Sequence, residues 1–362
     1  MRKIRDYMIL IIVFILIFSV VYYLWDYAML IFNVSIAILL AFLIGKSLYH
    51  FGPKKYTRNM KKVKPTEEAE RIYKELRSLY GNEYAKVRIV NCICLFSGVF
   101  LWVELFIARE RKILEEYMVN IVLLLTYLII RIILKNQERL SKIYKEKILP
   151  DFIRMFPNGT TEYYQGKEYT TNETYRIDDA YRTSGFNSEE YIDIDVMDCI
   201  KCSSEDTNVE MANIWISDKN QEKQDVIFNG LFAYADSAKN INYFIKISKN
   251  KVIKKKHKVD MDSSDFEEIF DIHSRNNVYT MRILTPEVMM LLWDFYQKYE
   301  LKFEVILSGN KIYLRFYTGN IFDVKLFGNS MNKNNLFIYY SIMEFVVELT
   351  KSINKALEKV EL

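Results

Sequence analysis

The sequence predicts an α-helical membrane anchor of four helices in two hairpins, followed by a soluble α+β domain of antiparallel hairpins with late helices. Two observations predict this division. The first 134 of the 362 residues hold four long apolar runs. From about Glu162 onward, polar and apolar side chains alternate as they do in strands, and the helical periodicities gather near the end.

The expected membrane domain covers residues 1–134. Its apolar runs span residues 7–24, 28–45, 89–108 and 117–134. A helix of about eighteen residues is about 27 Å long, close to the thickness of a bilayer core. Only Trp25-Asp26-Tyr27 separates the first two runs, which predicts a tight hairpin with interfacial aromatic residues. The first run leads into bulky Tyr22-Tyr-Leu-Trp-Asp26, which favours a retained helix over a cleaved signal peptide.

A further helix is predicted over residues 66–80, between the second and third runs. It opens at Pro65-Thr-Glu-Glu68, where the carboxylates suit the positive end of the helix dipole, and Gly81-Asn82 should stop it. Its apolar residues recur every three or four positions, so one face should be buried. We expect that face to pack on the C-terminal domain or to lie at the membrane surface. A dedicated partner-binding helix is the alternative.

Basic residues predict the orientation in the membrane. They cluster before the first run, at Lys54–Lys64, and from Arg131 onward. With four spans, these clusters fall on one side, which should be the cytoplasmic side of the membrane. Both termini are then cytoplasmic. The Arg109–Lys112 linker is the contrary evidence, partly offset by three glutamates.

Two lysine clusters are candidates for contact with lipid headgroups. Solvated lysines need no ligand, but a domain tethered to an anionic leaflet could rest on it through them. The candidate residues are Lys54, Lys55, Lys61, Lys62, Lys254, Lys255 and Lys256. The net charge of +4 is too small to indicate nucleic-acid binding.

Residues 135–156 are expected to form a juxtamembrane connector, helical to about Leu149, and residues 157–362 the cytoplasmic α+β domain. The turn Ser308-Gly-Asn310 predicts a hairpin, and Asp236–Asn240 should turn the preceding strand pair. Helices are expected from Ser263/Ser264 to Phe270, from Thr285 to Tyr299, and from Phe337 to Leu357. The candidate strands are Tyr191–Val196, Met197–Cys202, Glu210–Ser217, Asp225–Tyr234, Tyr243–Ser248, Phe303–Leu307 and Lys311–Tyr317.

The residue patterns that could carry chemistry are weak. Cys199-Ile-Lys-Cys202 lacks the second ligand pair of a zinc site and lies in an expected strand, so we interpret both cysteines as incidental. Asp193 and Asp195 should share an exposed strand face. We therefore expect no catalytic, cofactor-binding or metal-binding residues. Gly230 should allow close backbone packing or a bulge.

Charged and polar residues within the apolar runs are the candidates for a transport function. Glu104 and Arg131 each lie about one turn from the end of a run, so both side chains can reach the interface. A transporter would be expected to place ionisable groups deep in several helices. Mild polar residues such as Asn91 are expected to make helix-to-helix contacts.

Several phrases occur in order along the second half of the chain. They are Ile143-Tyr-Lys-Glu-Lys-Ile148, Phe228-Asn-Gly-Leu-Phe232-Ala-Tyr-Ala-Asp236, Phe266-Glu-Glu-Ile-Phe270-Asp, Ile283-Leu-Thr-Pro-Glu-Val-Met-Met-Leu-Leu292 and Asn310-Lys-Ile-Tyr-Leu314. Together they resemble the DUF3137 family of uncharacterised bacterial membrane proteins over roughly residues 135–330. The resemblance implies N-terminal hydrophobic helices and a soluble domain of such hairpins, and no established activity.

Three functional hypotheses follow. The first is a non-enzymatic integral inner-membrane protein, in contact with lipid, whose cytoplasmic domain binds a protein partner or senses a ligand. It needs no cofactor and is compatible with a homo-oligomer. The second is a membrane-anchored enzyme that uses Asp193 and Asp195 or the Cys199/Cys202 pair. The third is a small transporter or its accessory subunit.

Overall fold

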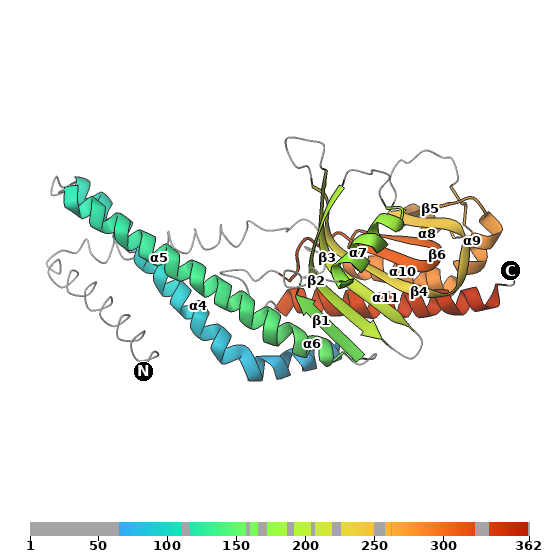
Figure 1. Ribbon diagram of the computed structural model, residues 1–362, viewed down its shortest axis with the longest axis horizontal. Coiled ribbons are helices and arrows are strands. Elements are labelled where there is room, and N and C mark those ends of the chain that lie inside the picture. The colour runs from blue at the N-terminus through green and yellow to red at the C-terminus, as the bar shows by residue number, and fades with distance from the viewer. Residues whose placement is uncertain are drawn as a thin grey trace. The chain divides into compact units, whose positions relative to one another are not determined.

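The structure is a computed structural model, and it describes residues 65–110, 116–156, 160–165, 172–186, 192–203, 207–218, 226–249, 258–261, 263–322 and 333–360 (Figure 1). These residues form two compact units. Lys86–Glu138 belongs to one unit, and the described residues up to Ala85 join Arg139–Leu362 in the other. The predicted membrane spans at residues 7–24 and 28–45 lie outside the described residues.

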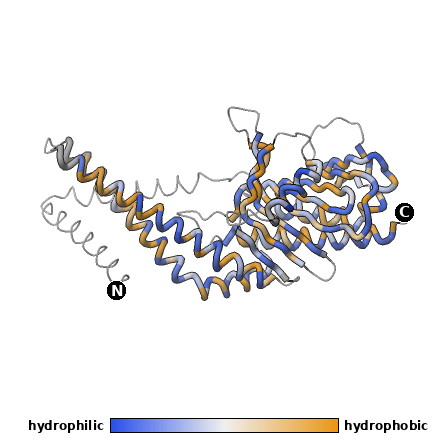
Figure 2. The backbone as a smooth tube through the Cα atoms, in the orientation of Figure 1, coloured by the Kyte–Doolittle hydropathy of each residue, from blue (hydrophilic) through white to orange (hydrophobic). Residues whose placement is uncertain are grey.

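The described residues of the first unit form a pair of helix segments. They belong to α4 (Glu67–Glu110) and α5 (Glu116–Ile143), which contain the third and fourth predicted spans. By length and composition, Glu67–Leu105 and Asn120–Arg154 could each cross a membrane, and only 22% and 6% of their apolar windows are buried. Figure 2 shows long hydrophobic stretches in both helices. Asn136 Nδ2 donates to Asn91 Oδ1 at 2.9 Å, so the expected helix-to-helix role of Asn91 is confirmed.

The predicted stop at Gly81-Asn82 is wrong, because α4 runs through it without a break. A glycine inside a helix costs only about 1 kcal/mol. The buried side chains of Ile72, Leu76 and Tyr84 continue one helical face past this position, so packing outweighs the local signal. Of the two expected placements, on the C-terminal domain or at the membrane surface, this part of α4 has the first, because it packs on the C-terminal domain. The Tyr73 ring meets Phe337 edge-on at 5.7 Å.

The connector also extends beyond its predicted end. After α5, a π-helical turn (Tyr144–Ile148) leads directly into α6 (Leu149–Arg154). The helix continues through Pro150, and the π-helical turn just before it changes the hydrogen-bond pattern, since the Leu149 N–H donates to the Tyr144 carbonyl. Tyr80 of α4 donates to the Asp151 carboxylate at 2.5 Å, which fixes α6 to the same unit.

An antiparallel sheet forms the centre of the second unit. Its strands are β1 (Thr160–Gln165), β2 (Ile192–Ser203), β3 (Asn208–Asp218), β4 (Val226–Lys249), β5 (Phe270–Ser274) and β6 (Phe303–Phe316). They follow the order β1-β2-β3-β4-β5, and β6 pairs with β4. The expected α+β domain with an antiparallel sheet is therefore confirmed.

Strand β6 folds back on itself. A straight strand of fourteen residues would be about 45 Å long. Instead, the Tyr317 N–H donates to the Lys302 carbonyl at 3.0 Å, and Glu304 bonds to Arg315. Gly309 adopts φ of 60° at the reversal. The hairpin predicted at Ser308-Gly-Asn310 is confirmed.

The hairpin predicted around Asp236–Asn240 is wrong. Leu231–Asp236 pairs with the second half of β6, whereas Ile245–Ser248 pairs with its first half. The two halves of β4 therefore lie on either side of the β6 hairpin, and Ile241 passes its tip opposite Gly309. Two apolar strands joined by a polar segment look the same in sequence whether or not another hairpin lies between them.

Helices cover both faces of the sheet (Figure 1). On one face lie α10 (Pro286–Tyr299) and α11 (Lys333–Lys359), and Phe295 stacks on Phe345 at 4.0 Å. On the other face, α7 (Asn172–Thr183) packs Tyr181 against Phe228 and Phe232. Ser263 and Thr285 cap α8 (Ser264–Ile269) and α10 as predicted, whereas α7, β1, β5 and α9 (Asn277–Ile283) were not predicted.

Candidate functional site

The lysines proposed to contact lipid, in the Lys54–Lys62 and Lys254–Lys256 groups, lie outside the described residues. Cys199 and Cys202 are both buried in β2 but sit three positions apart, so they project to opposite sheet faces. Burial raises the pKa of the Cys202 thiol. Within the described residues, no group of three or more His, Cys, Asp or Glu is arranged to hold a metal ion.

The predicted acidic pair and the membrane charges are not brought together either. Asp193 and Asp195 are exposed on β2, as the alternation predicted. Arg131 is exposed on α5, and Glu104 is half-buried on α4. These residues therefore do not assemble a site in the described part of the chain.

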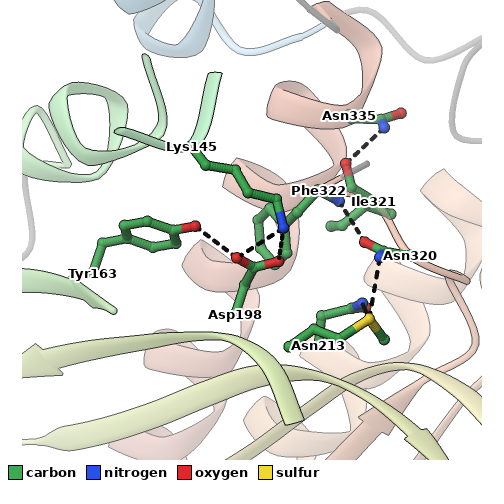
Figure 3. A network of polar contacts seen from close by, with 9 residues as sticks. Lys145, Tyr163, Asp198, Asn213, Asn320, Ile321, Phe322 and Asn335 are labelled. Carbon is green, nitrogen blue, oxygen red and sulfur yellow. Dashed lines mark hydrogen bonds and ion pairs between the residues drawn. The ribbon is translucent and has the colours of Figure 1, made fainter. Parts of the chain in front are cut away.

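The structure instead builds a polar centre around Asp198, which the sequence reasoning did not select. Asp198 is fully buried, next to a β-bulge between Val196 and Asp198 in β2. Lys145 of the π-helical turn places its Nζ 2.9 Å from Oδ2 and 3.2 Å from Oδ1. Tyr163 of β1 donates its hydroxyl to Oδ1 at 2.6 Å (Figure 3). The centre thus joins the connector, β1 and β2.

Burial determines the electrostatics of this centre. The Lys145 side chain is only 14% exposed, so its charge and that of Asp198 are both largely removed from water. Burial, together with the charge of Asp198 and the bond to it, raises the pKa of Tyr163, which keeps the phenol protonated as a donor. The arrangement neutralises a buried charge and leaves no water-accessible carboxylate for proton transfer.

A second set of bonds continues beside this centre (Figure 3). Asn320 donates to the Met197 sulfur at 3.3 Å and accepts from the Phe322 N–H at 3.0 Å. Asn335 donates to the Ile321 carbonyl at 2.7 Å. These bonds fix the segment after β6 between the bulge in β2 and the start of α11.

The opposite face of the sheet holds a second buried ion pair. Arg315 Nε donates to Glu304 Oε2 at 2.8 Å, and its Nη1 donates to the Tyr181 hydroxyl at 3.0 Å. Burial opposes ionisation of Glu304, but Arg315, assisted by Lys246 and Lys302, outweighs it and lowers the pKa of Glu304. The pair holds the α7 face of the β6 hairpin together.

A cavity of about 250 Å³ lies on the α7 side, where the end of β2 and the start of β3 meet the middle of β4 and Lys311 of β6. Its lining is polar. Glu210 bonds to Arg176 and accepts from the Tyr234 hydroxyl at 2.5 Å. Burial and the bond to Glu210 raise the pKa of Tyr234. The lining residues are Arg176, Lys201, Ser203, Asn208, Glu210, Tyr234, Asp236 and Lys311.

Comparison with known proteins places one part of the chain. Residues 226–355 match the model of the DUF3137 family, described as a protein of unknown function. The resemblance expected from the sequence is confirmed over this segment, which runs from β4 into α11 and excludes Ile143–Ile148. No curated protein matches. The crystal structure of the mycobacterial trehalose monomycolate transport factor A is similar at 9% identity, with 60% of this chain and 93% of that chain covered and a TM-score of 0.32.

Proposed function

We propose that this chain, whose residues 226–355 belong to the DUF3137 family, is a membrane-anchored, non-enzymatic binding protein. Its α+β domain binds a protein partner or senses a ligand at the cytoplasmic side of the inner membrane. The observation that carries this proposal is the buried Lys145–Asp198 pair, which attaches the connector helix to the sheet.

The ion pair supports a mechanical role for the connector. Burying two charges costs several kcal/mol per ion, and apolar residues of similar size would often stabilise a fold equally well. The pair does, however, hold the Lys145 ammonium group against both carboxylate oxygens of Asp198 in β2. We therefore assign it the role of fixing how the helix that leaves the membrane meets the sheet.

The state of the buried carboxylates favours binding over catalysis. Asp198, Glu304 and Glu210 each contact a cation, namely Lys145, Arg315 and Arg176. A general acid or base needs a pKa near the working pH and access to a substrate. The ion pair that lowers the pKa of Glu304 moves it away from that range.

The proposed topology has four membrane helices with both termini in the cytoplasm. Reporter fusions near residues 60, 110 and 362 should read inside, outside and inside. The two long apolar helices support membrane insertion. An outside signal at residue 362 would overturn the orientation.

Complementation of a deletion strain separates the proposal from the enzyme hypothesis. Asp193→Asn/Asp195→Asn and Cys199→Ser/Cys202→Ser variants should complement, whereas Asp198→Ala should fail even when its membrane level matches that of the wild type. The proposal is contradicted if the Asp193/Asp195 and Cys199/Cys202 variants reach the wild-type membrane level but do not complement. Glu104→Gln should also complement, and a transport defect in that variant would favour the transporter hypothesis.

Crosslinking from native membranes with the full chain as bait then identifies the partner. A species captured by the wild type and lost in Asp198→Ala is the expected result. Equal capture by both chains would show that the attachment of the connector has no part in binding.

A further inference from the structure

We infer that the cavity lined by Arg176, Lys201 and Glu210 is a binding site for a small molecule that carries a phosphate or carboxylate group. This inference rests on the proposed function, because it names the class of ligand that the domain would sense. The site lies on the α7 face, where β2 ends and β3 begins, apart from Asp198 on the other face.

The carboxylates of the cavity are already engaged. Glu210 bonds to Arg176 through Oε1 and to Tyr234 through Oε2. Asp236 accepts from Lys311 Nζ at 3.0 Å, and the same ammonium group lies 4.6 Å above the Tyr234 ring. Among the described lining residues, these two pairs therefore use both carboxylates.

Lys201 is a further cation in the lining. In the sheet register it lies between Glu162 on β1 and Glu210 on β3, yet among the described residues it forms no ion pair with either. Glu162 instead bonds to the Tyr164 hydroxyl. The side chain of Arg176 is 51% exposed beside it. The charged residues of the described lining are three cations, Arg176, Lys201 and Lys311, and two carboxylates, Glu210 and Asp236, so their summed charge is positive and an anionic group would complement it.

The size of the cavity limits the ligand. The volume of about 250 Å³ is many times the minimum that holds one water molecule, so a small anion fits. This space suits inorganic phosphate or a small carboxylate and excludes a folded partner. Ser203 and Asn208 add neutral polar groups to the lining, which can orient an oxyanion through hydrogen bonds.

The test is a titration of the purified full chain in detergent, with thermal unfolding and calorimetry as readouts. Sodium phosphate and sodium acetate are the probes, and sodium chloride at matched ionic strength is the reference. At least one probe should raise the unfolding temperature saturably. Saturation by phosphate alone or by acetate alone decides which oxyanion the site takes.

Matched variants assign the effect to the cavity. Lys201→Met should weaken the apparent affinity by at least about tenfold, the loss expected for one hydrogen bond to a charged group. Lys201→Arg should retain binding, and Lys74→Met, a change at an exposed lysine on α4, should not alter it. Unfolding without probe checks that each variant folds.

Two results overturn the inference: no saturable response to either probe, or a response that Lys201→Met retains. If neither probe binds but complementation still requires Asp198, only the anion-site inference is contradicted. If neither probe binds and complementation does not require Asp198, the proposed function is contradicted as well.

Discussion

Replacing Asp198 by Ala should strongly destabilise the sheet domain. The carboxylate is fully buried and the Lys145 side chain is 14% exposed, so the substitution leaves an ammonium group without its counter-charge. Removing one partner of a buried pair typically costs about 3–5 kcal/mol. The cost includes the loss of the acceptor for the Tyr163 hydroxyl, since an unsatisfied buried donor costs about 1–3 kcal/mol.

Thermal unfolding followed by circular dichroism measures this loss. For a domain of this size, 1 kcal/mol shifts the unfolding temperature by about 2–4 °C. The Asp198→Ala chain should therefore unfold roughly 6–20 °C below the wild type. Lys145→Met should cost a similar amount, because it leaves the carboxylate unpaired.

The control is the triple variant Lys145→Met/Tyr163→Phe/Asp198→Val, which removes every polar member of the centre together. Apolar replacement of a complete buried pair is often neutral, so this chain should be more stable than Asp198→Ala. The reasoning is refuted if Asp198→Ala costs less than about 1 kcal/mol. It is equally refuted if the triple variant is as unstable as the single changes added together.

Three further predictions concern other positions in the sheet domain. Gly230→Ala would place a Cβ 2.0 Å from the Phe316 carbonyl oxygen, so it should lower the free energy of unfolding by about 3 kcal/mol or more. The Cβ of Gly309→Ala meets no atom within 4 Å, so only its positive φ should cost stability, about 1–2 kcal/mol. Equal losses of urea stability for the two would disprove the close-packing explanation. Thr285→Ala removes the cap of α10 and should cost about 1 kcal/mol by thermal unfolding, whereas an unchanged midpoint would show that the cap is dispensable. Because the pKa of Glu304 is lowered from 4.5, its contribution to stability is present above that value and is lost as pH falls through the folded-state pKa. Glu304→Gln should therefore flatten the acid side of the urea-midpoint profile, and an unaltered slope would contradict that assignment.

Local sequence signals predicted the features that depend on neighbouring residues. The turn at Ser308-Gly-Asn310 reverses β6 because Gly309 can adopt a positive φ, and Thr285-Pro-Glu287 begins α10 because its hydroxyl caps Val288. Gly230 was expected at a close backbone contact, and it lies against the backbone of Phe316. The exposed positions of Asp193 and Asp195 followed from strand alternation.

The features that depend on distant residues were not predictable in the same way. Lys145 and Asp198 are 53 positions apart, and each alone looks ordinary, one in a basic helix and the other in a strand. The two halves of β4 pair with different halves of the β6 hairpin. The polar segment between the halves of β4 does not encode that pairing. Packing likewise overrode the apparent stop at Gly81.

Hydrogen exchange across residues 144–154 in the full chain tests the central claim most directly. If the Lys145–Asp198 pair attaches the connector to the sheet, amides of the π-helical turn and α6 should be protected in the wild type. In Asp198→Ala they should exchange faster, and by a larger factor than the amides of β3 and β6, which report the loss of global stability. Unchanged protection of the connector in the variant would contradict the account.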